Sequence, residues 1–211
     1  MSDAASAHGS APGGVVPTGF AEIVEASLRG MITLRGDLAS KKLAAAVKAA
    51  TGTAVPGPRR IVLKGDKGAA WMSPDELLIL VPYAGVAEAM AALEKALGAE
   101  HALVADVSDA RATFAIRGPK ADQVLRKLSP ADLDTLTQDE IRRTRIAQVA
   151  GAFWRSGPEE FTLVTFRGLR VDDAYAHPLF NPAVDRETGF RTRQILCVPV
   201  RDSHGDVIAV A

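Results

Sequence analysis

The strands and helices that the sequence predicts come in groups, with two or three strands before each helix. Apolar residues with helical spacing predict helices over 38–50, over 86–97 and just after Pro119. A glycine, Gly52 or Gly98, follows each of the first two helices and is a common helix terminator. Apolar or alternating stretches predict strands at 31–34, 60–64, 69–72, 77–81, 101–107, 111–117, 141–154 (one long strand or a pair) and 160–166. This grouping favours an α+β fold over a doubly wound parallel sheet.

Length and charge limit the class of protein. A chain of 211 residues, 47% of them hydrophobic, can bury a core of its own. Its 25 Lys and Arg balance 25 Asp and Glu, which argues against a nucleic-acid binder with a basic face. The most apolar run, 77–87, is interrupted by Pro82 and is too short for a membrane span of about 18 residues. One cysteine, Cys197, excludes an internal disulfide and suits a reducing compartment, so we expect a cytoplasmic protein with no nucleic-acid or membrane partner.

Changes in composition divide the chain into three parts. Residues 1–19 are rich in Gly, Ser, Ala and Pro, without the pattern of a signal peptide, and predict a flexible leader. Residues 20–167 hold the grouped strands and helices and predict one domain. From 168 on the sequence is polar and turn-rich, until a strong strand at 194–200 and a second at 207–211 predict a short C-terminal β-hairpin. Because a two-stranded hairpin is marginally stable in water, we expect it to pack poorly and 174–188 to be irregular and mobile.

No motif in the sequence predicts a catalytic, cofactor-binding or metal-binding residue. The four histidines lack metal-ligand spacing, and Cys197 lies within an apolar strand, where a thiol is usually inert. No phosphate loop, dinucleotide fingerprint or nucleophile elbow is present. Asp106 and Asp109 flank Ser108 at the end of a predicted strand, where turn formation explains them better than acid–base chemistry. The sequence therefore does not predict a self-sufficient enzyme.

Two features are candidates for partner contacts. Arg143 and Arg145 would share one face of a strand, next to Arg142, so that two guanidinium groups could clamp a partner's carboxylate. The alternative is a solvated, charged strand edge that discourages aggregation. Trp154, after Phe153, is either part of the core or an interface anchor, because Trp and Arg are over-represented at interfaces. We keep Arg143, Arg145 and Trp154 as interface candidates.

Several segments together resemble one known family. The order and spacing hold from about residue 29 to 167, and the matching segments are 29–37, 56–60, 71–78, 106–111, 118–119, 130–133, 143–148 and 153–154. These segments resemble the gamma subunit of heterotetrameric sarcosine oxidase. The resemblance implies a fold like the folate-binding domain of the glycine-cleavage T-protein. It also implies alpha, beta and delta partner subunits, which would hold FAD, FMN and NAD. They would oxidise sarcosine to glycine and pass the methyl carbon to tetrahydrofolate or release formaldehyde. The gamma subunit would then be a structural partner with no catalytic residue and no cofactor of its own.

The C-terminal segment departs from that family. Residues 173–181, 184–185, 188–193 and 195–200 resemble the middle of a GAF domain of the cyclic-nucleotide phosphodiesterase type. The segment lacks the rest of such a domain, so we expect that neither cyclic AMP nor cyclic GMP raises the melting temperature. An alternative function is a GAF-type ligand-binding or dimerisation module of a signalling protein. A third alternative, a folate-dependent aminomethyltransferase, would need a catalytic Asp in a segment that we do not find. The longer resemblance favours a non-catalytic subunit of sarcosine oxidase.

Overall fold

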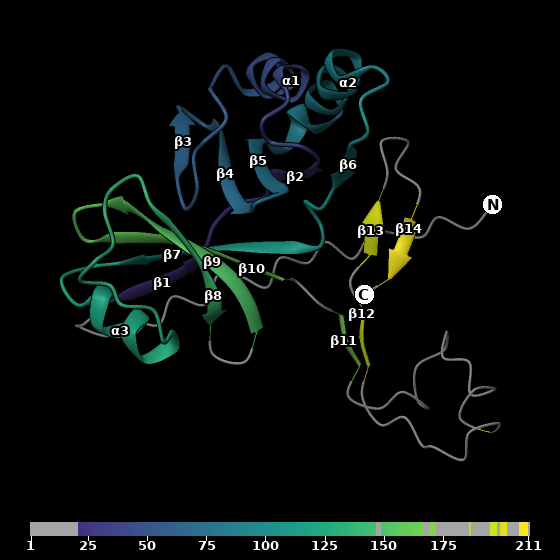
Figure 1. Cartoon of the computed structure of the whole chain (residues 1–211). Coiled ribbons are helices and arrows are strands. Elements are labelled where there is room, and N and C mark those ends of the chain that lie inside the picture. Colours follow the sequence, from purple (N-terminus) through teal and green to yellow (C-terminus); the bar gives the residue numbers. More distant parts are fainter. Residues whose placement is uncertain are drawn as a thin grey trace.

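The fold consists of two facing antiparallel sheets with helices on their outer sides (Figure 1). The computed structural model describes residues 21–146 and 149–166, Arg186, and the short strands Leu169–Val171, Ile195–Cys197, Pro199–Arg201 and Val207–Val210. Two helices cover the outer face of the first sheet, and a third helix covers the outer face of the second. The predicted α+β class, with strands and helices in groups, is confirmed.

The first sheet contains strands from the first half of the chain and two strands from its end. Its order is β14-β13-β6-β2-β5-β4-β3, and each pair of neighbours is antiparallel. The strands are β2 (Arg29–Arg35), β3 (Ile61–Lys64), β4 (Lys67–Ser73), β5 (Glu76–Pro82), β6 (Leu103–Asp106), β13 (Pro199–Arg201) and β14 (Val207–Val210). Strand β5 is central and is buried along almost its whole length, which explains its continuous apolar sequence.

Helices α1 (Lys41–Thr51) and α2 (Val86–Leu97) pack against one another and against the first sheet. Ser40 caps α1, since its hydroxyl accepts hydrogen bonds from the backbone amides of Lys42 and Leu43. Gly52 ends α1 in the left-handed conformation, with φ of 73°. The prediction placed the start of α1 at residue 38. The helix starts later because the Asp37 side chain accepts from the amide of Ala39 and forms a turn there.

The second sheet has the order β1-β7-β10-β9-β8 and is also antiparallel. Its strands are β1 (Glu22–Glu25), β7 (Arg111–Arg117), β8 (Ile141–Ile146), β9 (Val149–Gly157) and β10 (Glu160–Phe166). Helix α3 (Ala121–Leu128) covers its outer face, together with Leu133 and Leu136 from the loop that follows. The predicted strand at 141–154 is a pair, β8 and β9. Strand β1 was missed, because four half-buried residues show no clear period.

The inner faces of the two sheets form the central core. Along β5, Leu77, Ile79 and Val81 point to the helices, whereas Leu78 and Leu80 point to the second sheet. Strand β9 shows the same alternation: Trp154 lies in the core between the sheets, and Phe153 lies on the side of α3. The result is a helix–sheet–sheet–helix arrangement in which both sheets have two buried faces.

The C-terminal strands extend the first sheet and form a separate two-stranded sheet. Strands β13 and β14 form a hairpin, as predicted, with Pro199 opposite Val210. The predicted single strand at 194–200 is instead divided into two strands, and the hairpin uses the second of them. Strand β13 also pairs with β6 through Arg201 and Asp106, so the hairpin extends the first sheet. Strand β12 (Ile195–Cys197) pairs with β11 (Leu169–Val171). The predicted leader at 1–19 and, apart from Arg186, the segment 174–188 lie outside the described residues. No helix within the described ranges is both long enough and apolar enough to cross a bilayer.

Candidate partner-binding site

The candidate site lies along β8, the edge strand of the second sheet. One face of β8 is directed toward the first sheet, because its residue Ile141 belongs to the core between the sheets. Since side chains alternate along a strand, Arg143 and Arg145 lie on this same face. After Ile141 this face of β8 is no longer covered by the first sheet, and both arginines are exposed. The sequence-based placement of Arg143 and Arg145 on one face is therefore correct.

Arg143 is held by the first sheet. Its Nη1 donates a hydrogen bond to the carbonyl oxygen of Met72 at 3.1 Å and lies 3.8 Å from the Glu76 carboxylate. Glu76 is buried at the start of β5, and Arg35 of β2 also approaches it at 3.8 Å. A buried carboxylate loses its hydration, and nearby cations compensate for that loss. Arg143 is thus a bridge between the two sheets as well as a surface residue.

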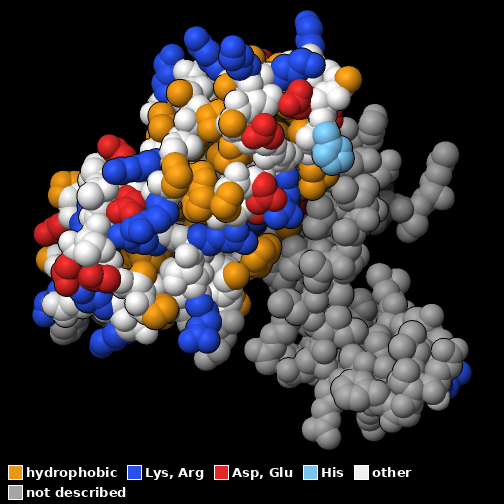
Figure 2. Space-filling view, viewed as in Figure 1, with side chains coloured by type: hydrophobic (Ala, Val, Ile, Leu, Met, Phe, Trp, Pro, Cys, Tyr) orange, Lys and Arg blue, Asp and Glu red, His pale blue; other side chains and the backbone are white. Residues whose placement is uncertain are grey.

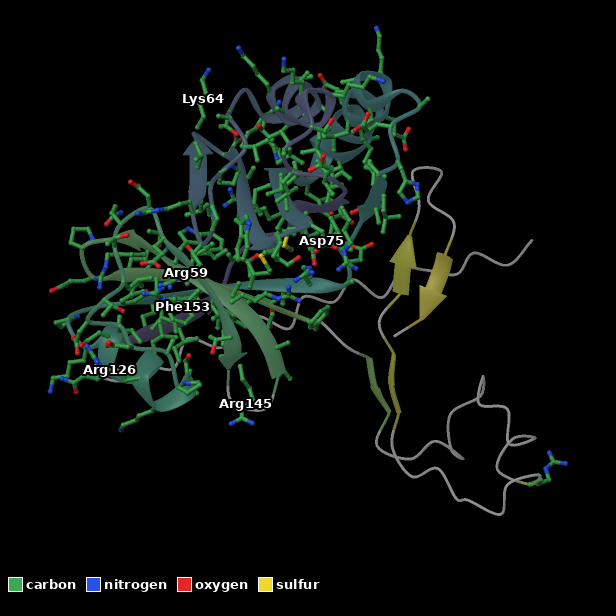
Figure 3. All side chains as sticks on the ribbon, in the orientation of Figure 1. Arg59, Lys64, Asp75, Arg126, Arg145 and Phe153 are labelled. Atoms are coloured by element: carbon green, nitrogen blue, oxygen red, sulfur yellow. The ribbon has the colours of Figure 1, made fainter. Side chains whose placement is uncertain are left out.

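Arg145 is different, because it makes no ion pair with any described residue. Figure 3 shows its side chain projecting away from the body of the fold. Arg142, the third arginine of the cluster, points to the other side of β8, where it pairs with Glu140 and donates to the carbonyl and hydroxyl oxygens of Thr135. The three arginines therefore have three different roles, and the structure shows Arg143 and Arg145 in different surroundings rather than as a preformed clamp.

Two exposed apolar side chains lie at the same end of the second sheet as Arg145, Phe166 on the same face and Val149 on the face of α3. Val149, which pairs with Ile146 at the start of β9, is 41% exposed, and Phe166 at the end of β10 is 45% exposed. The guanidinium of Arg111 stacks over the Phe166 ring, 4.8 Å from its centroid. Burial lowers the pKa of Arg111, and nearby Glu76 opposes that shift. An exposed cation and an exposed aromatic side chain at one end of a sheet are a composition typical of protein–protein contacts.

A pocket of about 510 Å³ adjoins this edge, at the boundary of the two sheets. Arg59, Arg142 and Arg143 line it, together with Asp132 and the apolar residues Trp71, Met72, Ala131 and Ile141. Figure 2 shows hydrophobic side chains over β3 and β4, with Lys and Arg side chains near the boundary between the sheets. Such a surface suits a segment that carries both acidic and apolar groups.

The other sequence candidates have structural roles. Trp154 is 2% exposed and lies in the core, as one of the two interpretations expected, so its side chain is not presented to a partner. Asp106 accepts from the amide of Ser108, and the Ser108 hydroxyl accepts from the amide of Met31, which ties the loop to β2. The interpretation of these residues as turn formers is correct. Within the described ranges, no group of three or more His, Cys, Asp or Glu side chains is placed to hold a metal ion.

Sequence reasoning missed Glu76, Arg111 and Phe166. Glu76 directly precedes an apolar strand, so its position carried no sign of a buried charge. Arg111 and Phe166 are 55 residues apart in the chain and meet only because β7 pairs with β10, where they are directly opposite. Nothing local in the sequence marks such a pair.

Comparison with known proteins identifies the family. The model of the sarcosine oxidase gamma subunit family matches residues 35–139. Sarcosine oxidase subunit gamma from an Arthrobacter species is 35% identical over 162 residues, which cover 74% of this chain and 75% of that protein. The chain belongs to the sarcosine oxidase gamma subunit family. The gamma subunit from Corynebacterium sp. strain P-1 is also 35% identical, over 124 residues, and the chain spans only 60% of its length. The resemblance seen in the sequence is therefore confirmed.

Solved structures agree with this family assignment. A chain of the heterotetrameric sarcosine oxidase from Corynebacterium sp. U-96, in complex with pyrrole 2-carboxylate, superposes with a TM-score of 0.63 at 27% identity. The superposition covers 69% of this chain and 75% of that one. The glycine cleavage aminomethyltransferase T from Bartonella henselae superposes with a TM-score of 0.51 at 18% identity, over 69% of this chain and 42% of that one, and shares the fold. The predicted relation to the T-protein fold is confirmed.

A second, shorter stretch of the chain is similar to a protein of another class. A dual 3′,5′-cyclic-AMP and -GMP phosphodiesterase 11 from Drosophila melanogaster is 39% identical over 74 residues. These residues are 35% of this chain but 4% of the phosphodiesterase. A match to so small a part of that protein does not carry its activity to this family member.

Proposed function

We propose that this chain is the gamma subunit of a heterotetrameric sarcosine oxidase and acts as a non-catalytic subunit that supports assembly. The observation that carries the proposal is the match to a gamma subunit over 75% of that subunit's length, together with the same fold. Alpha, beta and delta subunits would be its partners. They would hold FAD, FMN and NAD, use tetrahydrofolate and oxidise sarcosine to glycine, in the cytoplasm.

The way in which the polar groups of the fold are used supports a structural role. Asp106 and Ser108 tie a loop to β2, Tyr83 donates to Asp109 at 2.8 Å, and Glu76 is surrounded by arginines. Each of these carboxylates already accepts hydrogen bonds or ion pairs from neighbours that hold the sheets together. Groups that maintain the fold in this way are poorly placed to exchange protons with a substrate.

We infer that the partner contact lies at the end of β8 and β9. Arg145 and Phe166 are exposed there on one face of the sheet, Val149 is exposed on the other face, and Arg145 has no described carboxylate partner. An acidic side chain of a neighbouring subunit would complete the charge of Arg145, while Phe166 would supply apolar area. Arg143 would contribute less, because it keeps its bonds to Met72 and Glu76 within the chain.

The test is the affinity of the purified chain for the remaining subunits, with variants compared by titration. Replacement of both Arg143 and Arg145 with Ala should weaken assembly by about 2–5 kcal/mol if the partner charge is buried. Arg145→Ala alone should account for most of that loss. The matched control is Arg126→Ala on α3, an exposed arginine that pairs with Asp122 and Asp134 on the outer side of the second sheet.

An unchanged affinity in the double variant would show that Arg143 and Arg145 do not bind a partner and would favour the alternative of a solvated strand edge.

A second assay tests catalysis directly. The isolated chain should neither oxidise sarcosine nor hold a flavin through gel filtration. Peroxide production from sarcosine by the pure chain would show that the proposal of a non-catalytic subunit is wrong.

A further inference from the structure

Strand β8 is an open edge of the second sheet, because it has a neighbour, β9, on one side only. The amide of Ile141 points away from β9, since it donates to the carbonyl oxygen of Arg59 at 3.0 Å. Backbone groups alternate between the two sides of a strand, so the amides and carbonyls of Arg143 and Arg145 also point away from β9. No hydrogen bond joins these outward backbone groups to another described residue.

The beginning of β8 is already paired on this outer side. Arg60 and Glu140 form an isolated antiparallel bridge there. The chain then leaves the edge, because the amide of Arg60 donates to the carbonyl of Gly57 and closes a tight turn. No described strand therefore continues the pairing beside Arg143 and Arg145.

Arg59 is the third residue of this turn and has an unusual backbone conformation. Its φ of 60° lies in the left-handed region, and among the described residues other than glycine it is the one with a positive φ. Glycine usually occupies such a position in a turn. The Arg59 guanidinium pairs with the buried carboxylate of Glu140, where the two sheets meet (Figure 3). The turn thus ends the internal pairing and places a cation at the end of the open edge.

The pocket of about 510 Å³ provides space beside this edge. Two of its lining residues, Met72 and Ile141, belong to the core between the sheets. Arg142 and Arg143 of β8 line it as well, and the loop after α3 contributes Ala131, Asp132 and Thr135. Unpaired backbone groups next to open space are what an extended segment needs in order to add to a sheet.

The charges along the edge favour an acidic segment. Four arginines lie here with three carboxylates among their ion-pair partners and the pocket lining: Arg59, Arg142, Arg143 and Arg145 with Glu76, Glu140 and Asp132. Arg145 is the cation of this group that makes no ion pair with a described residue. A second copy of this chain paired along the same edge would bring arginines close to arginines, and like charges in facing positions destabilise a strand pair.

We propose that an extended, acidic segment of a partner subunit adds to β8 as a further strand of the second sheet. Its backbone pairs with the outward amides and carbonyls of Arg143 and Arg145. Side chains directly opposite one another on neighbouring strands share a face, so a carboxylate opposite Arg145 meets its guanidinium. This inference rests on the proposed assembly function and specifies how the partner is bound.

The test compares Arg145→Ala with Arg145→Pro in the titration against the remaining subunits. Both variants lack the guanidinium, but only the proline variant also lacks the backbone amide that the added strand would bind. Because this amide points away from β9, the fold should tolerate proline at this edge position. Arg145→Pro should bind about tenfold more weakly than Arg145→Ala, since one interface hydrogen bond is lost.

The matched control is the same pair of changes at Ile23 of β1, the opposite edge of the same sheet. The amide of Ala26 donates to the carbonyl of Thr113 in β7, so by alternation the amide of Ile23 points away from β7. Ile23→Ala and Ile23→Pro should therefore bind the remaining subunits equally. A gap at Ile23 as large as the gap at Arg145 would show that proline acts through the fold, which would overturn the proposal.

Hydrogen exchange of the wild-type chain decides the question without a proline variant. The amides of Arg143 and Arg145 should exchange rapidly in the isolated chain and become protected in the assembled complex. Equal affinities of Arg145→Ala and Arg145→Pro, or amides that remain unprotected, would overturn strand addition and leave a contact through side chains alone. Dimers of the pure chain that Arg145→Pro abolishes would assign the edge to a second copy and also overturn the proposal.

These outcomes are distinct from a failure of the proposed function. Each of them leaves the gamma-subunit assignment intact, because the wild-type chain still assembles. A wild-type chain that does not bind the remaining subunits at all would contradict the assembly function, and the added strand with it.

Discussion

The two sheets are covered on their outer sides in different ways. The first carries two helices of 11 and 12 residues that pack against one another, and α1 has both a serine cap and a terminal glycine. The second carries α3, with 8 residues and no side-chain cap, and the loop residues Leu133 and Leu136 complete its cover. Regular helices with marked ends are easy to predict from sequence and expensive to disturb. The short helix was predicted only by its start after Pro119, the loop beside it was not predicted, and both are easier to disturb.

The largest effect is expected from truncating a buried leucine beneath the helices, and each sheet offers one such leucine. Leu93 of α2 and Leu125 of α3 are both 0% exposed. Leu93→Ala should cost about 3–4 kcal/mol of unfolding free energy, because the cavity lies between two helices and a sheet that cannot collapse onto it. Leu125→Ala should cost about 2 kcal/mol, since the loop beside α3 can relax into the space. Urea unfolding of both variants measures the difference, and a larger cost for Leu125→Ala would reverse the comparison.

A smaller effect is expected where the two halves meet. Glu76 of the first sheet faces Arg35 from the same sheet and Arg143 from the second. Glu76→Gln keeps the shape but leaves these cations without their shared carboxylate. We expect a loss of about 2 kcal/mol in unfolding free energy, below the ~3–5 kcal/mol of a fully buried pair, because both arginine side chains are half-exposed.

The result for Glu76→Gln also separates two views of the contact between sheets. If Glu76 links the halves, Arg143→Ala in the Glu76→Gln background should cost less than Arg143→Ala alone, as a double-mutant cycle would measure. Equal costs in both backgrounds would show that the two residues are not coupled.

The smallest expected effect concerns the helix cap that only the first half has. The Ser40 hydroxyl accepts from the amides of Lys42 and Leu43 at 3.2 and 3.4 Å. Ser40→Ala should lower the unfolding free energy by about 1 kcal/mol, and Ser40→Gly by only a few tenths. Thermal unfolding followed by circular dichroism can detect both. If the Ala variant is as stable as the wild-type chain, the cap contributes less than its geometry indicates.

The same difference explains what could be predicted from the sequence. The bounds of α2 and the C-terminal end of α1 followed from periodicity and from Gly52 and Gly98, because helical signals are local. Strand β1 was missed, and the facing of the two sheets was not predicted, because both depend on pairings between distant segments such as β1 with β7. At the candidate site, the shared face of Arg143 and Arg145 followed from alternation, but the Glu76 cluster did not.

The central claim is that this chain works as one subunit of a flavin-dependent oxidase. The direct measurement is affinity purification of the tagged full chain, expressed at its native level in the cell that encodes it, followed by mass spectrometry and an absorbance spectrum. We expect three further polypeptides in equal amounts, flavin absorbance in the same fraction, and peroxide production on addition of sarcosine. A chain that purifies alone, or with partners that carry no flavin, would contradict the account and favour the signalling alternative.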